Sequence, residues 1–277
     1  MRSCRASRSR IASVNEGLCR RLGDLATETW AHMDYGFNRG YGRPDERAFT
    51  DHHLIELCRH HQREIQASKF DQNTEAQTAA DFEWWIGDGE SYLPARVQAK
   101  KLHLHDAAYQ ELANPTSDKT ELQIERLIRA AREDGFLPLY LFFNGPTKDD
   151  PGPDRCANLA HQPENRGCAI AWAPEVLRVM TAAKNRHLTT IAPACWPWQC
   201  FICCPAVGGL HPGQRLLDLL SVGGVDLESE PGARLTRDLP DYVRITRNAD
   251  FLGVVPPDQF DPDPLPGART VLTLTLS

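Results

Sequence analysis

The sequence lacks any long run of apolar residues. A helix that crosses a bilayer needs about 20 consecutive apolar residues, and no stretch of this 277-residue chain approaches that length. The first residues, MRSCRASRSRIASVNEG, are rich in Arg and Ser but lack the apolar segment of a secretory signal. We therefore expect no contact with a membrane. We interpret residues 1–20 as a disordered N-terminus, with a transit peptide as the alternative.

The sequence also lacks an excess of positive charge and an even set of cysteines. Its formal net charge is −6, which excludes a globally basic nucleic-acid binder, so an anionic partner would need a local basic patch or a bound metal. The nine cysteines are scattered and odd in number, unlike the disulfide framework of a small secreted protein. We therefore expect a reducing, cytoplasmic setting.

The pattern of apolar residues predicts an α/β fold. With 41% hydrophobic and 25% charged residues, the composition is that of an ordinary globular protein. A helix, three strands, a helix and a strand follow one another, which is typical of an α/β core. These elements are a helix over 18–35, a helix from about Thr50, strands at 65–72, 80–87 and 95–102, a helix from the capping-box residue Thr120 to Gly135, and a strand at 137–143.

We expect one core domain over residues 21–145. Its first three strands are predicted to form a meander, and the run LPLYLFF at 137–143 should lie in the middle of the sheet because it is apolar on both faces. A loop rich in Pro, Gly and Asp is predicted at 146–168. Residues 169–277 are expected to be a C-terminal elaboration packed on the core.

Polar side chains converge on two of the predicted strands. Asp81 and Glu83 share one face of their strand, and Gln98 and Lys100 share one face of the next, because side chains two residues apart point the same way. If the strands pair, a carboxylate, an amide oxygen and an ammonium group meet. Mg²⁺ prefers hard oxygen ligands of this kind, and a lysine beside the metal can neutralise charge that builds on a phosphate.

The lysine is what makes this pattern specific. Among the six lysines, only Lys100 has an acidic or amide residue two positions before it. An Asp followed later by Gln or Glu, any residue and Lys also arises by chance, roughly once in a chain of this length. The alternative interpretation is therefore a structural domain in which Asp81 and Lys100 form an ion pair.

With Asp81 on one strand and Gln98-x-Lys100 on the next, the order of elements resembles the PD-(D/E)xK nuclease fold, a mixed central sheet flanked by helices. The Gln variant is similar to the Mrr-type restriction endonucleases. The chain also resembles a family of uncharacterised bacterial proteins in its segments TEAQTAADFEWWIG, VQAKKL and ELQIERLIRAAREDGFLPLYLFFN. The resemblance covers about residues 44–145, with a weaker similarity at PWQCFICC.

The resemblance implies roles for particular residues. Asp81 and Gln98 would bind Mg²⁺ or Mn²⁺, Ala99 would lend its carbonyl, and Lys100 would be catalytic. The family pattern matches Glu75 after the first strand, and a helix-borne glutamate, for which we prefer Glu46, would also join the metal site. This chain departs from the motif in two places, because Ala80 replaces Pro before the aspartate and Gln98 replaces a carboxylate. The less anionic site then depends on Glu46, Glu75 or Glu83.

Residues near the motif are candidates for contacts with phosphates. Those that flank the predicted site are Arg96, Lys101, His103 and His105. Arg126, Arg129 and Arg132 are spaced three apart on a helix, where a solvated face paired with Glu125 and Glu133 is favoured over phosphate binding. Trp84 and Trp85 are expected in the core. The C-terminal cysteines 195, 200, 203 and 204 contain one CxxC pair and no second pair, so buried thiols are favoured over zinc.

The sequence therefore predicts a magnesium-dependent nuclease that hydrolyses DNA phosphodiester bonds, with bacterial defence as one interpretation of its role. RNA as the target and a homodimeric state stay open. The alternative is a catalytically inactive module of the same fold that binds nucleic acid or acts as a sensor or interaction domain. Binding of Mg²⁺ through Asp81 would separate the two.

Overall fold

A mixed sheet of seven strands forms the centre of the part of the chain that the structure describes, with strand order β1-β7-β2-β3-β4-β5-β6. The structure is a computed structural model. It describes residues 3–40, 44–60, 65–69, 75–88, 90–116, 118–149, 162–209, 211–241 and 270–275. The strands are β1 (Ile65–Lys69), β2 (Phe82–Gly87), β3 (Tyr92–Lys101), β4 (Leu137–Phe143), β5 (Cys168–Trp172), β6 (Cys195–Pro197) and β7 (Thr270–Thr275).

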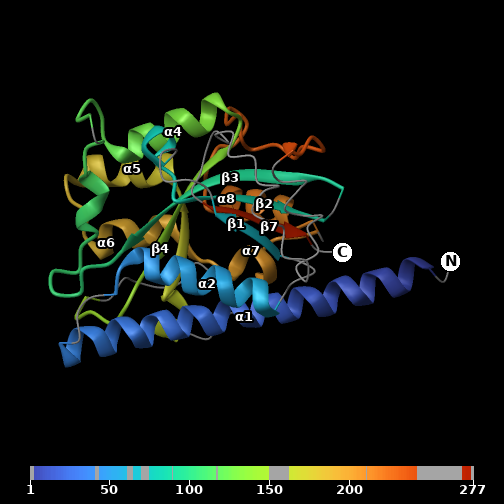
Figure 1. The fold of residues 1–277 in the computed structure, drawn as a ribbon, viewed down its shortest axis with the longest axis horizontal. Coiled ribbons are helices and arrows are strands. Elements are labelled where there is room, and N and C mark those ends of the chain that lie inside the picture. The colour runs from blue at the N-terminus through green and yellow to red at the C-terminus, as the bar shows by residue number, and fades with distance from the viewer. Residues whose placement is uncertain are drawn as a thin grey trace, which may run out of the picture.

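Helices cover both faces of the sheet (Figure 1). One face carries α4 (Gln123–Glu133) and α5 (Ala173–Ala183), and the other carries α1 (Ser3–Arg39), α2 (Glu46–His60) and α7 (Cys200–Cys203). The remaining helices are α3 (Glu75–Thr78), α6 (Leu188–Ile191), α8 (Pro212–Val222) and the 3-10 turns η1 (Gln110–Ala113), η2 (Pro163–Arg166) and η3 (Ala192–Ala194). The fold is thus α/β with a mixed central sheet flanked by helices, consistent with the expected restriction-endonuclease-like core.

β4 lies inside the sheet, as its sequence predicts. It pairs with β3 in parallel and with β5 in antiparallel orientation, so both of its edges are hydrogen-bonded. All residues of LPLYLFF are buried because helices cover both faces of the strand. The continuous apolar run, without alternation, is what such a position requires.

The predicted meander is only partly correct. β2 and β3 form an antiparallel hairpin in which Glu83 is opposite Arg96. β1, however, does not pair with β2, because β7 lies between them, parallel to β2 and antiparallel to β1. The C-terminal residues thus do more than pack on the core, since β5, β6 and β7 extend the same sheet. Pairing between segments this far apart leaves no local pattern in the sequence.

The N-terminal segment is helical, which corrects the prediction of a disordered start. α1 includes residues 3–20, and Leu18 is buried. Leu22, Leu25 and Thr29 follow on the same side and are also buried, which confirms the apolar face predicted over 18–35. No helix among the described residues is both long and apolar enough to cross a bilayer.

A cysteine pair ties α1 to α7. Cys19 and Cys203 form a disulfide across 184 residues of sequence. The expectation of a buried thiol is therefore wrong for Cys203, which is also not available to a zinc site. Cys200 and Cys204 are buried thiols, as favoured from the sequence, and the short helix α7 has the sequence CFIC.

Gly167 allows α1 to approach the start of β5. A Cβ added at Gly167 would lie 1.8 Å from the carbonyl oxygen of Ala26 and 3.0 Å from the backbone nitrogen of Trp30. By contrast, a Cβ added at Gly23, also in α1, would meet no atom within 4 Å. The backbones of η2 and α1 can therefore touch only where a side chain is absent.

This difference predicts opposite effects of the same substitution. Gly167→Ala should lower the free energy of unfolding by about 1–3 kcal/mol or more, because the methyl group pushes α1 away from the sheet. Gly23→Ala, the matched control, should raise it by about 0.5–1 kcal/mol because alanine favours a helix over glycine. Urea denaturation of both variants measures the two values. Equal stability of the variants would contradict the close contact.

Candidate active site

Asp81 stands where β2 begins and faces the next strand. Its backbone N–H donates a hydrogen bond to the carbonyl of Val97 (2.9 Å). Its carboxylate Oδ2 accepts the backbone N–H of Ala99 (2.6 Å). The carboxylate thus takes a position in the strand ladder and is held beside the Gln98–Lys100 segment, as the strand pairing predicted. Asp81 remains partly exposed to solvent.

The Gln98 amide is oriented by two partners from other elements. Its Oε1 accepts a hydrogen bond from the Tyr140 hydroxyl on β4 (2.9 Å). Its Nε2 donates to Oε1 of Gln123, the first residue of α4 (3.3 Å). Gln98 is 5% exposed. A buried amide that is bonded at both ends presents its oxygen in one fixed direction.

Lys100 lies between the first residues of two helices. Its Nζ is 3.8 Å from Oε1 of Glu46, which begins α2, and donates to Oε1 of Gln123 (3.4 Å). Lys100 is 5% exposed, so its charge depends on these neighbours. Glu46 is therefore the glutamate outside the hairpin that the structure brings to the predicted site.

Two features of this arrangement differ from the sequence-based expectations. α2 begins at Glu46, not near Thr50, whose hydroxyl bonds back to the Glu46 carbonyl. α4 begins after Leu122, whose backbone N–H is bonded by the Glu125 carboxylate (2.9 Å). Thr120 instead bonds Asp118.

These starting points explain why Gln123 was missed as a site residue. Gln123 lies three residues after Thr120, which is the spacing of a capping box. A capping role for Gln123 gives no indication of its contacts with Gln98 and Lys100. Tyr140 was also missed, because it lies within an apolar strand. Its position opposite Gln98 in the β3–β4 register could have indicated it.

The pKa shifts of nearby groups indicate that the carboxylates of Glu46 and Asp81 both lie close to this cluster. Burial raises the pKa of Glu46, Lys100 opposes that shift, and the nearby acids Glu111 and Asp45 add to it. The pKa of the Tyr140 hydroxyl is raised well above its ordinary value by burial first, and then by the charges of Asp81 and Glu46. The hydroxyl that bonds Gln98 is therefore within the field of both acids.

The donor set fits a hard divalent cation. Asp81 and Glu46 offer carboxylate oxygens and Gln98 offers an amide oxygen, which are the ligand types that Mg²⁺ and Mn²⁺ accept. The raised pKa of Glu46 fits as well, because a cation would offset the cost of a buried negative charge. Chemically, the arrangement can hold a cation and a phosphate beside a buried ammonium group.

Not every predicted site residue reaches this cluster. The side chain of Glu75, at the start of α3, lies outside what the structure describes. Glu83 is buried and paired with Arg96 (Oε1 to Nε, 3.1 Å), so the interpretation of Glu83 as a second ligand is not supported by its surroundings.

Arg96 is a correction to the predicted phosphate contacts. It is buried, bonds the Ala130 carbonyl (3.0 Å), pairs with Asp134 (2.6 Å) and lies over the Phe136 ring (4.5 Å to the centroid). Such a side chain is unavailable to a phosphate in solvent. The sequence gives no sign of this burial. Arg96 lies two residues before Gln98 on the same face of β3, and α4 covers the sheet there.

The other predicted contacts lie nearer the surface. Lys101 donates to the Pro44 carbonyl (3.0 Å), and His103 bonds Glu111 (2.7 Å). Lys101 and His103 line a small surface pocket together with Met33, Phe37, Pro44, Leu102 and Leu104. His105 is half exposed.

The arginines of α4 are paired with acids, as favoured from the sequence; Glu133 is a partner as expected, whereas the Glu125 carboxylate accepts the backbone N–H of Leu122. Arg126 bonds Asp118 and Glu121, and Arg129 bonds Glu121 and Glu133. Arg132 reaches the buried Glu230 (2.9 Å). These side chains stabilise the surface around α4.

Comparison with known proteins identifies the family. The family model described as "Family of unknown function (DUF6615)" matches residues 18–271. The chain belongs to this family. The DUF6615 match extends from α1 to the start of β7, so it includes the predicted core together with β5 and β6. It confirms the resemblance to an uncharacterised family, whereas membership of the nuclease superfamily stays a prediction. No curated protein matches the chain in sequence.

The raised pKa of Glu46 predicts how stability depends on pH. Below the ordinary pKa of 4.5 the Glu46 carboxyl is protonated in both the folded and the unfolded state, so its ionisation does not change the free energy of unfolding. As pH rises, the unfolded state ionises first, so wild-type stability falls until the folded carboxyl also ionises. Glu46→Gln should therefore match the wild type at low pH and be more stable at pH 7. Chemical denaturation across pH measures this difference.

The matched control is Glu228→Gln, which removes an exposed glutamate. Its stability should differ from the wild type by the same small amount at every pH. If Glu46→Gln is less stable than the wild type at pH 7, the ion pair with Lys100 outweighs the cost of burying Glu46, and the assigned direction of the shift is wrong.

Proposed function

We propose that this protein is a metal-dependent phosphodiesterase that hydrolyses DNA. The observation that carries the proposal is the environment of Lys100, whose Nζ lies 3.8 Å from Glu46 and 3.4 Å from Gln123 at the same end of β3 as Asp81 and Gln98. A structural ion pair needs one acid and one base. Here two acids, two amides and one lysine converge, which is the set that phosphodiester hydrolysis uses.

Each side chain has a role that follows from its contacts. Asp81, Glu46 and the Gln98 oxygen would hold Mg²⁺ or Mn²⁺, and the cation would supply charge stabilisation and lower the pKa of a bound water. Tyr140 orients the Gln98 amide, and Gln123 holds the Lys100 ammonium group in position. Lys100 would neutralise the negative charge that grows on the phosphate as the bond to the leaving oxygen lengthens.

The neighbouring surface supports a nucleic-acid substrate. The net charge of −6 gives no general attraction for DNA. Lys101 and His103, however, follow Lys100 on the chain and line the pocket that contains the Phe37 ring. A base could stack on such a ring while the phosphate meets the basic side chains. We take DNA as the substrate, with RNA as the outcome to test against it.

A DNA target agrees with the cytoplasmic setting and the role in bacterial defence expected from the sequence. In a reducing cytoplasm the Cys19–Cys203 bond would be open to reduction, and α1 would then be held to α7 by packing alone. A homodimer, with one copy for each DNA strand, is part of this proposal.

One observation favours the second candidate function, a binding or sensor module without catalysis. Gln98 replaces a carboxylate, and its Oε1 already accepts the Tyr140 hydroxyl. An inactive descendant would keep this buried polar cluster for stability and lose its affinity for cations. The two functions therefore differ in whether Asp81 and Glu46 bind a metal.

Replacing Lys100 tests the catalytic assignment. Lys100→Ala should reduce Mg²⁺- or Mn²⁺-dependent cleavage of plasmid DNA on the order of 100-fold or more, because the developing charge loses its stabiliser. Lys148→Ala, which removes an exposed lysine, should cleave like the wild type. Circular dichroism checks that both variants fold. Undiminished cleavage by the Lys100 variant would remove this lysine from the mechanism, and parallel assays with RNA decide the substrate.

Calorimetry with Mg²⁺ and Mn²⁺ separates the enzyme from the inactive module. The wild type should bind one of these cations, and Asp81→Asn should weaken binding at least tenfold because a ligand charge is lost. A matched control is Asp226→Asn, at an exposed position. The absence of any heat that depends on Asp81 would favour the binding module over the nuclease.

A further inference from the structure

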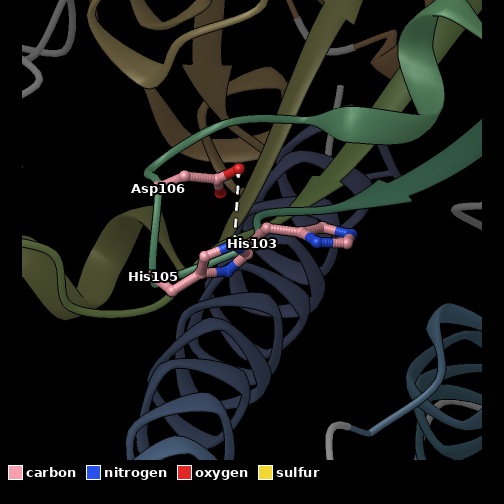
Figure 2. Close-up of side chains that lie close together, drawn as sticks. All are labelled: His103, His105 and Asp106. Atoms are coloured by element: carbon pink, nitrogen blue, oxygen red, sulfur yellow. Dashed lines mark ion pairs between the residues drawn. The ribbon is translucent and has the colours of Figure 1, made fainter.

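The turn that follows β3 brings together three potential metal ligands. One ligand atom each from His103, His105 and Asp106 lies within 4.8 Å of the others, and no further group of three such residues occurs in the described ranges. Figure 2 shows the His105 ring facing the Asp106 carboxylate, with Nε2 3.5 Å from Oδ2. The His103 and His105 ring centroids are 6.1 Å apart.

Backbone contacts hold this turn in place. His103 and Ala108 exchange two hydrogen bonds, from N–H to carbonyl, of 2.9 and 3.3 Å. Leu188 at the start of α6 donates its N–H to the Ala107 carbonyl (2.7 Å). The ends of the turn are thereby fixed to β3 and to α6, so the three side chains do not depend on a loose loop for their position.

A carboxylate behind His103 sets the state of its ring. Oε1 of Glu111 lies 2.7 Å from Nε2 of His103, and a carboxylate can only accept, so Nε2 carries the proton. Nδ1 then keeps the lone pair that a metal requires. A histidine oriented by a carboxylate in this way is the usual support for a metal ligand.

Two buried oxygens at the turn have unused acceptor capacity. Oδ1 of Asp106 and Oε2 of Glu111 are inaccessible to solvent and have no hydrogen-bond partner among the described residues. The other oxygen of each carboxylate is engaged, that of Asp106 by Gln110 and that of Glu111 by His103. An unsatisfied buried acceptor is costly, and a cation bound by Asp106 would offset that cost at its carboxylate, whereas Glu111 lies on the far side of the His103 ring.

We propose that His103, His105 and Asp106 form a binding site for a first-row transition metal, with Zn²⁺ as its expected occupant and Glu111 as the residue that orients His103. Two imidazoles and one carboxylate select such metals over Mg²⁺, which prefers oxygen ligands. Three protein ligands leave one tetrahedral position for water, as in zinc sites that accept a substrate.

Only a modest movement is needed to close the site. Ligand atoms about 2.0–2.1 Å from a tetrahedral ion lie about 3.3 Å from one another, compared with the present limit of 4.8 Å. His105 can provide this movement because its side chain is half exposed. The side chains of His103 and Asp106 are more buried than that of His105.

The site is separate from the one assigned to Mg²⁺ and does not depend on it. It uses none of Asp81, Gln98 or Lys100. Glu111 lies between the two sites, since it supports His103 and also contributes to the raised pKa of Glu46. A phosphate held by the two histidines, as expected from the sequence, is the competing role, and the experiment below distinguishes it.

Metal titration of the full chain without a histidine tag tests the proposal. After treatment with a chelator, the wild type should bind one equivalent of Zn²⁺ by calorimetry, and Co²⁺ should give the strong visible absorption of a four-coordinate site. His105→Ala should weaken binding at least tenfold because a ligand is lost. Glu111→Gln should weaken it 10–100-fold through His103. His32→Ala, at an exposed histidine of α1, should bind like the wild type.

A second variant separates this site from the nuclease proposal. Asp81→Asn should leave Zn²⁺ binding unchanged even if it abolishes binding of Mg²⁺. The proposal is overturned if the wild type binds no Zn²⁺, if His105→Ala and His32→Ala bind equally, or if Asp81→Asn removes the Zn²⁺. Binding of inorganic phosphate, and not of Zn²⁺, that is lost in His105→Ala would assign the histidines to phosphate contact instead.

Discussion

Three polar side chains, those of Arg96, Gln98 and Lys100, lie buried on one face of β3, and a polar group without a partner costs more there than anywhere else in the fold. The surrounding elements supply those partners. β2 and the end of α4 satisfy Arg96, β4 and the start of α4 satisfy Gln98, and the starts of α4 and α2 satisfy Lys100. The starts of α2 and α4 therefore lie close to the polar row, while the apolar residues of both helices pack into the core.

The row of polar residues changes in character along the strand. Arg96 is enclosed by Glu83, Ala130 and the Phe136 ring and serves the structure. Lys100 is equally buried, yet its neighbour Glu46 reaches the solvent, as does Asp81. After Lys101 the chain turns, and the next basic side chains are the histidines His103 and His105. Chemistry is therefore expected at the end of β3 where the polar row meets the surface.

The two proposed cation sites lie next to each other at this end. Oxygen donors surround Lys100, whereas imidazoles gather a few residues further on, and Glu111 influences both. The DUF6615 match over residues 18–271 contains all the residues of both proposed sites. Both sites therefore belong to the matched region of the chain.

The sequence by itself determined the elements with strong local patterns and the pairing that follows from them. The hairpin of β2 and β3, the buried run of β4, the apolar face of α1 and the shared face of Gln98 and Lys100 could all be predicted, because each depends on a period of two or on the helical period within a short window. Asp81 was placed beside Gln98 for the same reason.

The tertiary structure decided everything that depends on contacts between distant segments. No local period in the sequence predicts that β7 lies between β1 and β2 or that Arg96 is enclosed. The same holds for the contacts that Gln123 and Tyr140 make at the site. Glu46 was one of several candidate glutamates until α2 placed it beside Lys100. Packing chooses among residues that look equivalent in the sequence, because it alone determines which of them share a burial site and a charge.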